Sequence, residues 1–470
     1  MRRAARGGIA ALLAVVVAAL PVSAGAGERE LGERFMLEAR AALPFIDDPS
    51  VTDVVRRNAR RLVEQLGPQE FDYQFFVVRH PSLNAFAVPG GYIFIFSGLV
   101  ARANSEDELV GVLAHEIAHI HAHHVVRQQA AGQVWTAAGL LGVLLSAINP
   151  VLGAGAIAAA QTAQLKFSRD FEQEADYLGV RLAAESGYDP RALSGFFKHL
   201  LDEQRLNPSG APPYMLSHPV TEDRVTNVEA LIKAQSLSTP PGRPAAGLNM
   251  REARAVARAL TEPAEVVIES QRREVDAHPD DAGAHFLLGR TYQTVGQLEA
   301  ARTALVQSEK LGVGPLVDRP LGSLYLALKE HDLARRHLEK HLAADPRDGW
   351  SRLELGKVLA ATDDADGSIR EYRRAIDLDP ELDEAHRLLG VTLGRRGDEE
   401  EGLYHLAMAA RLRGDLVQAL RHFQRVESLS EEGSARRAES EKAIENLQEV
   451  VQDQAPPPTT SRTPRARPRW

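Results

Sequence analysis

The spacing of apolar and polar residues predicts strands as well as helices in the first half of the chain. Residues 71–78 are largely apolar and predict a strand. Residues 84–88 and 92–96 flank Pro89-Gly90-Gly91 as the two arms of a hairpin do. Helical patterns surround these strands, so we expect an α+β domain over residues 27–235.

The second half of the chain contains a helical repeat. A linker rich in Ser, Pro and Gly, residues 236–248, precedes it. Leu-Gly pairs then recur at spacings of 33, 34 and 34 residues, ending in Gly289, Gly322, Gly356 and Gly390. This period resembles the tetratricopeptide repeat, a helical hairpin that stacks into a solenoid and binds peptides or proteins. We expect the repeat domain to cover 249–430, with its first helices capping the array.

The end of the array departs from the repeat pattern. Gly402 stands where an alanine is expected, and Gly414 stands where a proline should close the unit. The helix at about 399–413 is therefore expected to serve two neighbouring repeats. A terminal helix is predicted over 431–453, and the Pro- and Arg-rich residues 454–470 predict a disordered basic tail.

Composition adds a cellular location and excludes several kinds of site. Arg2, Arg3 and Arg6 precede an apolar run at 9–20 and small residues at 22–26, which predicts a cleaved signal peptide over 1–26. The 470 residues include no cysteine, which excludes disulfides, thiolate metal sites and lipid attachment at cysteine. We therefore expect a periplasmic protein that is not a lipoprotein.

The net charge is –9, and both the signal peptide and the tail are basic, so the folded body is more acidic than the whole chain. This charge argues against nucleic acid as a partner.

The most specific motif is His115-Glu116-Ile117-Ala118-His119. Ser105 and Glu108 form a capping-box signature before it, and the apolar residues that follow have helical spacing. Two histidines four residues apart lie on one face of a helix, where both can bind one zinc ion. Glu116 can then act as general base toward a water molecule that the metal makes more acidic.

The third ligand cannot be the histidine of the metzincin pattern, because Ala122 and Val125 occupy its key positions. His123 would lie about 12 Å from His115 along one helix, too far to share a tetrahedral ion with it unless the helix bends. We therefore expect the neighbouring histidines to be solvated or to support the ligands; they are His121, His123 and His124.

An acidic helix offers another source for the third ligand. It is predicted to open near Ser168 and to stop at Gly187. Residues in this helix include Glu172 and Glu174, and their spacing alone does not decide between them.

The sequence from Glu172 to Asp176 matches the Glu-x-x-Ala-Asp motif. With the first motif, it resembles the gluzincin metallopeptidases of the HtpX and CAAX-prenyl-protease type. The resemblance implies an α+β zincin-type metallopeptidase domain, followed here by an all-α tetratricopeptide-repeat solenoid. It makes Glu172 the third ligand of one zinc ion per subunit, and it places Asp176 to orient an imidazole ligand.

Ser217-His218-Pro219 resembles the His-Pro segment of the same family, most closely in its periplasmic subgroup with tetratricopeptide repeats, the β-barrel assembly-enhancing proteases. The resemblance implies that His218 can occupy the open zinc position and hold the enzyme latent. The alternative is an oxyanion-stabilising or structural histidine. Arg224 is a catalytic candidate as a transition-state partner, or else a structural one.

Two further segments bear on substrate access. Residues 128–165 carry no charged side chain and are expected to form a buried or surface-lying helical hairpin, or to contact the outer membrane through 131–163. Because this segment lies between the two ligand motifs, it can also cover the cleft. An extended peptide is expected to add to an edge strand formed by Tyr92, Ile93, Phe94, Ile95 and Phe96.

The sequence therefore predicts a periplasmic zinc endopeptidase. The resemblance implies that it cuts misfolded or stalled outer-membrane proteins and docks on the β-barrel assembly machinery through its repeats. The alternative is a chaperone or scaffold that acts mainly through the repeats, with a largely latent metal site. An intramembrane protease is disfavoured because no convincing membrane span remains after signal cleavage.

Overall fold

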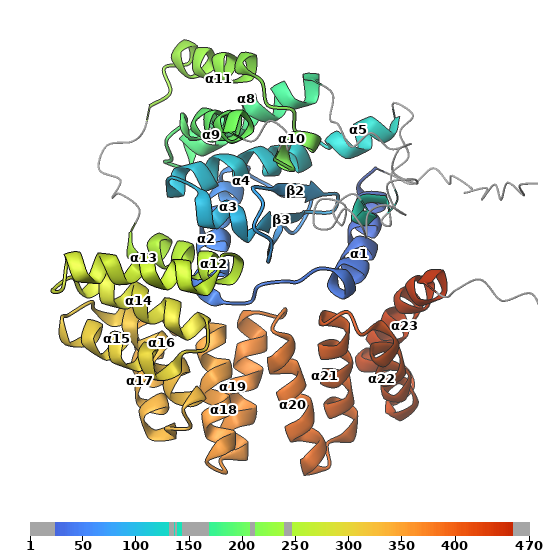
Figure 1. The fold of residues 1–470 in the computed structure, drawn as a ribbon. Helices are drawn as coiled ribbons and strands as arrows, with labels where there is room; N and C mark the ends of the chain where they lie inside the picture. Colours follow the sequence, from blue (N-terminus) through green and yellow to red (C-terminus); the bar gives the residue numbers. More distant parts are fainter. Residues whose placement is uncertain are drawn as a thin grey trace, which may run out of the picture.

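The computed structural model describes residues 24–130, 136, 139–142, 169–206, 212–238 and 247–454 (Figure 1). The predicted signal peptide, the basic tail and most of the uncharged segment at 128–165 lie outside the described residues. Among the helices that are described, none is long and apolar enough to cross a membrane.

A three-stranded sheet forms the centre of the first domain. Its strands are β1 (Gln74–Val78), β2 (Ala85–Val88) and β3 (Tyr92–Phe96), in the order β1-β3-β2. β3 runs antiparallel to β2 and parallel to β1. The predicted hairpin is confirmed, and its turn uses positive φ angles of 86° at Gly90 and 99° at Gly91, which glycine adopts without strain. β1 starts later than the predicted strand because residues 71–73 precede the ladder.

The prediction that Tyr92–Phe96 forms an edge strand was wrong. β3 is the central strand, and Phe94 on it pairs with Phe76 of β1 on one side and with Phe86 of β2 on the other. Both sides of its backbone are therefore occupied. Its last four residues are buried, and an unbroken apolar run of this kind is typical of a strand covered on both faces.

Helices cover this sheet, and the helix that carries the first metal motif is almost wholly buried. α4 (Glu106–His121) packs against β2, α8 and α9, and its residues from Glu108 to Ile120 are buried. The other helices of the domain are α1 (Ala24–Ala42), α2 (Pro49–Gln65), α3 (Ser97–Arg102), α5 (His124–Ala130), α8 (Arg169–Glu185), α9 (Ala192–Leu206), α10 (Tyr214–Ser217) and α11 (Glu222–Ala234).

The second half of the chain forms antiparallel helical pairs, as the repeat predicted. Its described helices are α12 (Leu248–Thr261), α13 (Ala264–Ala277), α14 (Ala282–Thr294), α15 (Leu298–Lys310), α16 (Asp318–Ala327), α17 (His331–Ala344), α18 (Gly349–Ala361), α19 (Ala365–Leu378), α20 (Asp383–Arg396), α21 (Glu399–Leu412), α22 (Leu416–Leu429) and α23 (Ala435–Gln454). A short 3₁₀ turn, Pro315–Val317, precedes α16.

The repeated glycines are required by close helix packing. A Cβ atom on Gly289 would lie 2.6 Å from Cγ of Leu305, and one on Gly356 would lie 2.5 Å from the Tyr372 ring. In the last unit a Cβ on Gly390 would lie 2.7 Å from the carbonyl oxygen of Gly402. Two glycines therefore face each other there, which explains why Gly402 replaces the expected alanine. α21 packs against both α20 and α22, as expected.

The repeat helices contact the first domain at several places along the array (Figure 1). α12 packs on α2 and α3, and four of its side chains belong to the first domain's hydrophobic core: Met250, Ala253, Val256 and Ala257. At the far end of the array, α21 and α23 contact α1. Ion pairs reinforce the contact with α2, including Asp53–Arg319 at 2.8 Å and Arg56–Asp379 at 2.7 Å. The domain limits 27–235 and 249–430 stay predictions, and α12 joins the two cores.

Candidate metal centre

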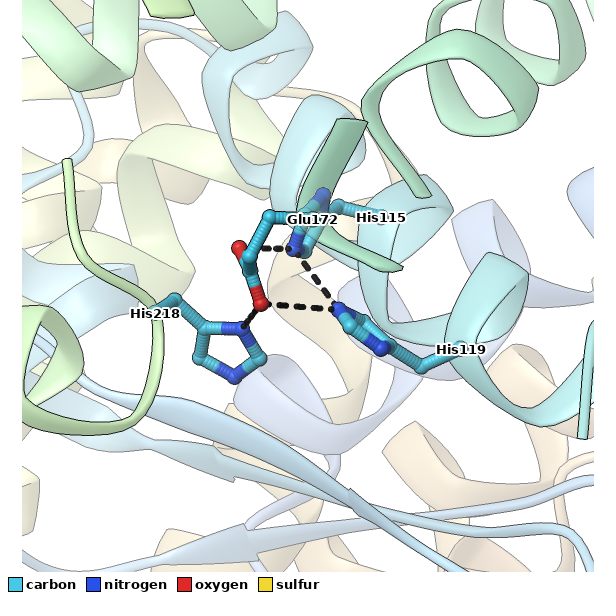
Figure 2. Close-up of side chains that lie close together, drawn as sticks. All are labelled: His115, His119, Glu172 and His218. Atoms are coloured by element: carbon cyan, nitrogen blue, oxygen red, sulfur yellow. Dashed lines mark hydrogen bonds and ion pairs between the residues drawn. The ribbon is translucent and has the colours of Figure 1, made fainter. Parts of the chain in front are cut away.

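Four buried side chains from three parts of the chain converge at one point (Figure 2). They are His115 and His119 on α4, Glu172 on α8, and His218 directly after α10. One potential ligand atom from each lies within 4.8 Å of the others. Their ligand roles stay predictions from the sequence.

The distances show which atoms face the centre. Nε2 of His115 and Nε2 of His119 are 3.1 Å apart, and each lies 3.5 Å from an oxygen of Glu172. Nδ1 of His218 lies 2.9 Å from Oε1 of Glu172. Glu174, the alternative that spacing left open, instead contacts His124 and Arg127 outside this group.

Local sequence explains how the two helices bring these groups together. The Ser105 side chain accepts a hydrogen bond from the Glu108 backbone N–H at 3.1 Å and starts α4, as the capping signature predicted. On α8, a Cβ atom at Gly179 would lie 3.0 Å from the backbone nitrogen of His115. This close packing of α8 on α4 places Glu172, two turns earlier, against the histidines.

Asp176 and Arg224 contact the predicted ligands His115 and Glu172. Oδ1 of Asp176 lies 3.0 Å from Nδ1 of His115, on the side of the ring away from the centre. Nε and Nη2 of Arg224 donate to the two oxygens of Asp176 at 2.8 and 2.7 Å, and Nη1 lies 2.7 Å from Oε2 of Glu172. The guanidinium also stacks on the Phe197 ring, with its carbon 4.4 Å from the centroid. These contacts favour the structural alternative for Arg224.

Glu116 is buried and lies next to His218. Its two carboxylate oxygens are buried and accept no hydrogen bond from the part of the chain that the structure describes. Nε2 of His218 lies 3.7 Å from Oε1. A buried carboxylate without a hydrogen-bond partner is unfavourable by itself.

Burial and neighbouring charges shift the pKa values of the converging side chains. Burial raises the pKa of Glu172, but His218 and His115 outweigh burial and hold it well below its usual value. Burial lowers the pKa of His115, but contacts with Asp176 and Glu172 overcome this and raise it to about 9. Burial and the neighbouring His115 instead hold the pKa of His119 well below its usual value. The carboxylate anion of Glu172 therefore faces one imidazole that favours a proton and one that disfavours it.

These residues fit a zinc ion. Two imidazoles and a carboxylate form a usual donor set for catalytic zinc, with a further position left for water or substrate. The donor atoms converge and their residues are buried. Asp176 lies against the outer nitrogen of His115, and His124 lies against that of His119. Metal-binding histidines usually have such a partner on the nitrogen that does not bind the metal.

Tyr214 is a site residue that the sequence reasoning missed. Its ring is fully buried and stacks on His218, with 4.7 Å between the ring centroids. Its hydroxyl has no hydrogen-bond partner among the described residues. The only available signal was its position one helical turn before His218, which has no meaning until the loop is placed over α4.

The neighbouring histidines differ from one another. His121 is exposed, as expected of a solvated residue. His123 contacts Glu28 and Glu70 at 3.1 and 3.4 Å, away from the four converging side chains. His124 is buried and lies against His119.

Comparison with known proteins relates this part of the chain to a peptidase family. The sequence profile described as Peptidase family M48 matches residues 48–232. Residues 48–232 are a peptidase family M48 domain. All four converging residues, together with Glu116, Asp176 and Arg224, lie within this M48 domain.

Several curated relatives carry protease names. The beta-barrel assembly-enhancing protease of Escherichia coli K12 is 32% identical over 43% of this chain and 42% of its own length. A Vibrio cholerae protein that bears this name provisionally is 39% identical over 42% of each chain. The mitochondrial metalloendopeptidase OMA1 of Schizosaccharomyces pombe is 31% identical over 37% of this chain and 51% of its own length. The chain thus spans about half the length of these relatives, or less.

Among solved structures, MamA from Desulfovibrio magneticus RS-1 covers 36% of this chain and 94% of its own, with 22% identity and a TM-score of 0.31. A similarity at this level supports no argument about function.

Proposed function

We propose that this protein is a zinc endopeptidase in which His115, His119 and Glu172 hold one zinc ion. The supporting observation is the convergence of these buried donors inside a peptidase family M48 domain. The ion would supply Lewis acidity at the peptide carbonyl and make the attacking water more acidic. The zincin-type arrangement of the domain belongs to the same proposal.

Glu116 is the proposed general base. Its carboxylate takes a proton from the attacking water and delivers it to the departing amine, so that the peptide bond is hydrolysed without a covalent intermediate. The unpartnered state of both oxygens suits this role, because no described hydrogen bond has to break before the proton is taken. Asp176 and Arg224 keep His115 and Glu172 in position.

An extended substrate would pair with β2. Because β3 is central, it is unavailable, whereas β2 pairs with β3 on one side and packs near α4. Ala87 and Val88 of β2 line the same small cavity as His119. Backbone pairing selects a substrate by its extended conformation more than by its side chains. This would suit unfolded or stalled chains as substrates.

The names of the bacterial relatives suggest a role in the envelope. We therefore propose a periplasmic location and substrates among misfolded or stalled outer-membrane proteins. The repeats are proposed to dock on the β-barrel assembly machinery. A pull-down from envelope extracts with the full chain would test this, with failure to recover any assembly component contradicting it.

A second candidate function is that of a chaperone or scaffold. The observation that favours it is the position of His218, which fills the group of donors and lies next to Glu116. A site in this closed state would be latent. If a Glu116→Gln variant fully restores a deletion strain, binding by the repeats is the principal function.

Metal analysis tests the leading proposal. The purified full chain should contain about one zinc ion per molecule, lose casein cleavage on treatment with a chelator, and regain it when zinc is added back. A chain without stoichiometric zinc that still cleaves casein would contradict the proposal.

A further inference from the structure

We propose that His124 positions the zinc ligand His119 by accepting a hydrogen bond from it. This inference rests on the proposed zinc site, and it assigns a positioning role to a residue outside the two metal motifs. Nδ1 of His124 lies 2.9 Å from Nδ1 of His119, and both rings are buried.

A break in the helix creates this contact. Five residues along a continuous α-helix correspond to a rotation of about 140° beyond one turn, so His124 would face away from His119. The chain instead leaves α4 at His121 and starts α5 at His124. His123 between them adopts the left-handed conformation, with φ of 52°, which is unfavourable for a residue that has a side chain. Such strain persists where the surroundings hold it, and here Glu28 and Phe71 contact the His123 ring.

The contact selects one tautomer of His119. Nε2 of His119 faces His115 and Glu172 and is therefore the nitrogen available to the metal. In a neutral imidazole the proton must then be on Nδ1, which donates to Nδ1 of His124. The remaining nitrogen of His124, Nε2, carries a proton and lies 3.3 Å from Oε2 of Glu174.

Residues of α8 hold His124 in place. Its ring stacks on Phe171 with a centroid distance of 4.7 Å and an interplanar angle of 22°. Arg127 lies over the same phenylalanine and donates to Glu174 at 2.9 Å. α8 therefore supplies both the ligand Glu172 and the support for His124. The two histidine ligands have separate partners: Asp176 for His115, and His124 for His119.

The test compares two substitutions in the full chain by measuring the zinc dissociation constant in competition with a chromophoric chelator. His124→Leu removes the acceptor, whereas His124→Asn keeps an oxygen near the position of Nδ1. We expect His124→Leu to weaken zinc binding 10- to 100-fold, the usual effect of losing such a partner, and His124→Asn to weaken it much less. His121→Leu, at the exposed histidine on the same segment, is the control and should leave zinc binding unchanged.

Thermal unfolding of the metal-free proteins separates positioning from folding. If His124→Leu unfolds like the wild type without metal but binds zinc more weakly, the inference is supported. Equal zinc affinity for His124→Leu and wild type, or equal losses for Leu and Asn, would overturn it. A wild-type chain that binds no zinc would instead contradict the proposed function.

Discussion

Oε1 of Glu116 lies 3.7 Å from Nε2 of His218, so the proposed general base and the loop histidine share one buried space. The other nitrogen of His218 contacts Glu172 at 2.9 Å. If a substrate carbonyl binds where this ring lies, the loop after α10 has to move before peptide hydrolysis, and His218 would then act as a latch.

The first prediction concerns this latch. His218→Ala should raise casein cleavage about tenfold or more, the gain expected if the open form is populated at one part in ten or less. Leu216→Ala is the matched control, because Leu216 lies in the same segment with 66% of its surface exposed. Unchanged or reduced cleavage by His218→Ala would show that the histidine is not inhibitory.

A second prediction distinguishes a structural from a catalytic role for Arg224. Arg224→Gln leaves the buried carboxylates of Glu172 and Asp176 without their cation, so the free energy of unfolding should fall by about 3 kcal/mol or more. Arg205→Gln, at an exposed ion pair, should change it by less than about 1 kcal/mol. Urea unfolding of the metal-free proteins measures both. Full stability with lost cleavage would instead indicate a transition-state role.

A third prediction tests how the repeats dock on the first domain. Gly414 has φ of 75°, and a Cβ atom there would lie 2.3 Å from the backbone nitrogen of Ala41 on α1. Gly296 has a similar φ of 79° with nothing within 4 Å. Both alanine variants should lose roughly 1–2 kcal/mol through backbone strain, and Gly414→Ala should lose more.

Amide hydrogen exchange measures the effect of each variant on α1 itself. Gly414→Ala should increase exchange in α1, whereas Gly296→Ala should not. If the two variants have the same stability and the same exchange in α1, the contact between α1 and the α21–α22 turn does not hold the domains together.

A fourth prediction concerns pH. Burial raises the pKa of Glu354 in α18 to about 7, although Ser323 and Lys357 oppose the shift. The folded protein therefore holds this proton more tightly than the unfolded chain, in which the pKa is about 4.5. The contribution to stability is fully present below about pH 4.5 and is lost as the pH rises to about 7.

Unfolding of wild type and Glu354→Gln between pH 4.5 and 8 measures this effect. The difference in unfolding free energy should change by roughly 3 kcal/mol in favour of the variant as the pH rises. Glu265→Gln, at an exposed position on α13, should show no such trend. A difference that stays constant with pH would contradict the assignment.

The local sequence was sufficient to predict the helices, strands and turns, but not which of them lie next to each other in the fold. The Ser105 cap, the hairpin turn at Gly90 and the stop of α8 before Gly187 depend on contacts within a few residues, and each was predicted. Which strand lies at the sheet edge depends on pairing between β1 and β3, 18 residues apart in register, and that prediction failed.

Part of the surroundings of the site could not be predicted from local sequence. Tyr214 reaches the site through tertiary contacts. Which of the neighbouring histidines lies against His119 depends on a left-handed residue that the pattern of a continuous helix does not reveal. The four converging side chains were easier to find, because helical spacing predicted the pair His115 and His119. The family resemblance implied Glu172 and, as one of two alternatives, a place for His218 beside them.

Glu116→Gln tests the central claim most directly. The amide keeps the shape of the side chain but cannot take a proton, so casein cleavage by the open His218→Ala form should fall 10²- to 10⁴-fold while zinc content stays at about one ion per molecule. Glu185→Gln, at an exposed ion pair on α8, should leave both unchanged. Cleavage that persists in Glu116→Gln with bound zinc would contradict the proposed enzyme.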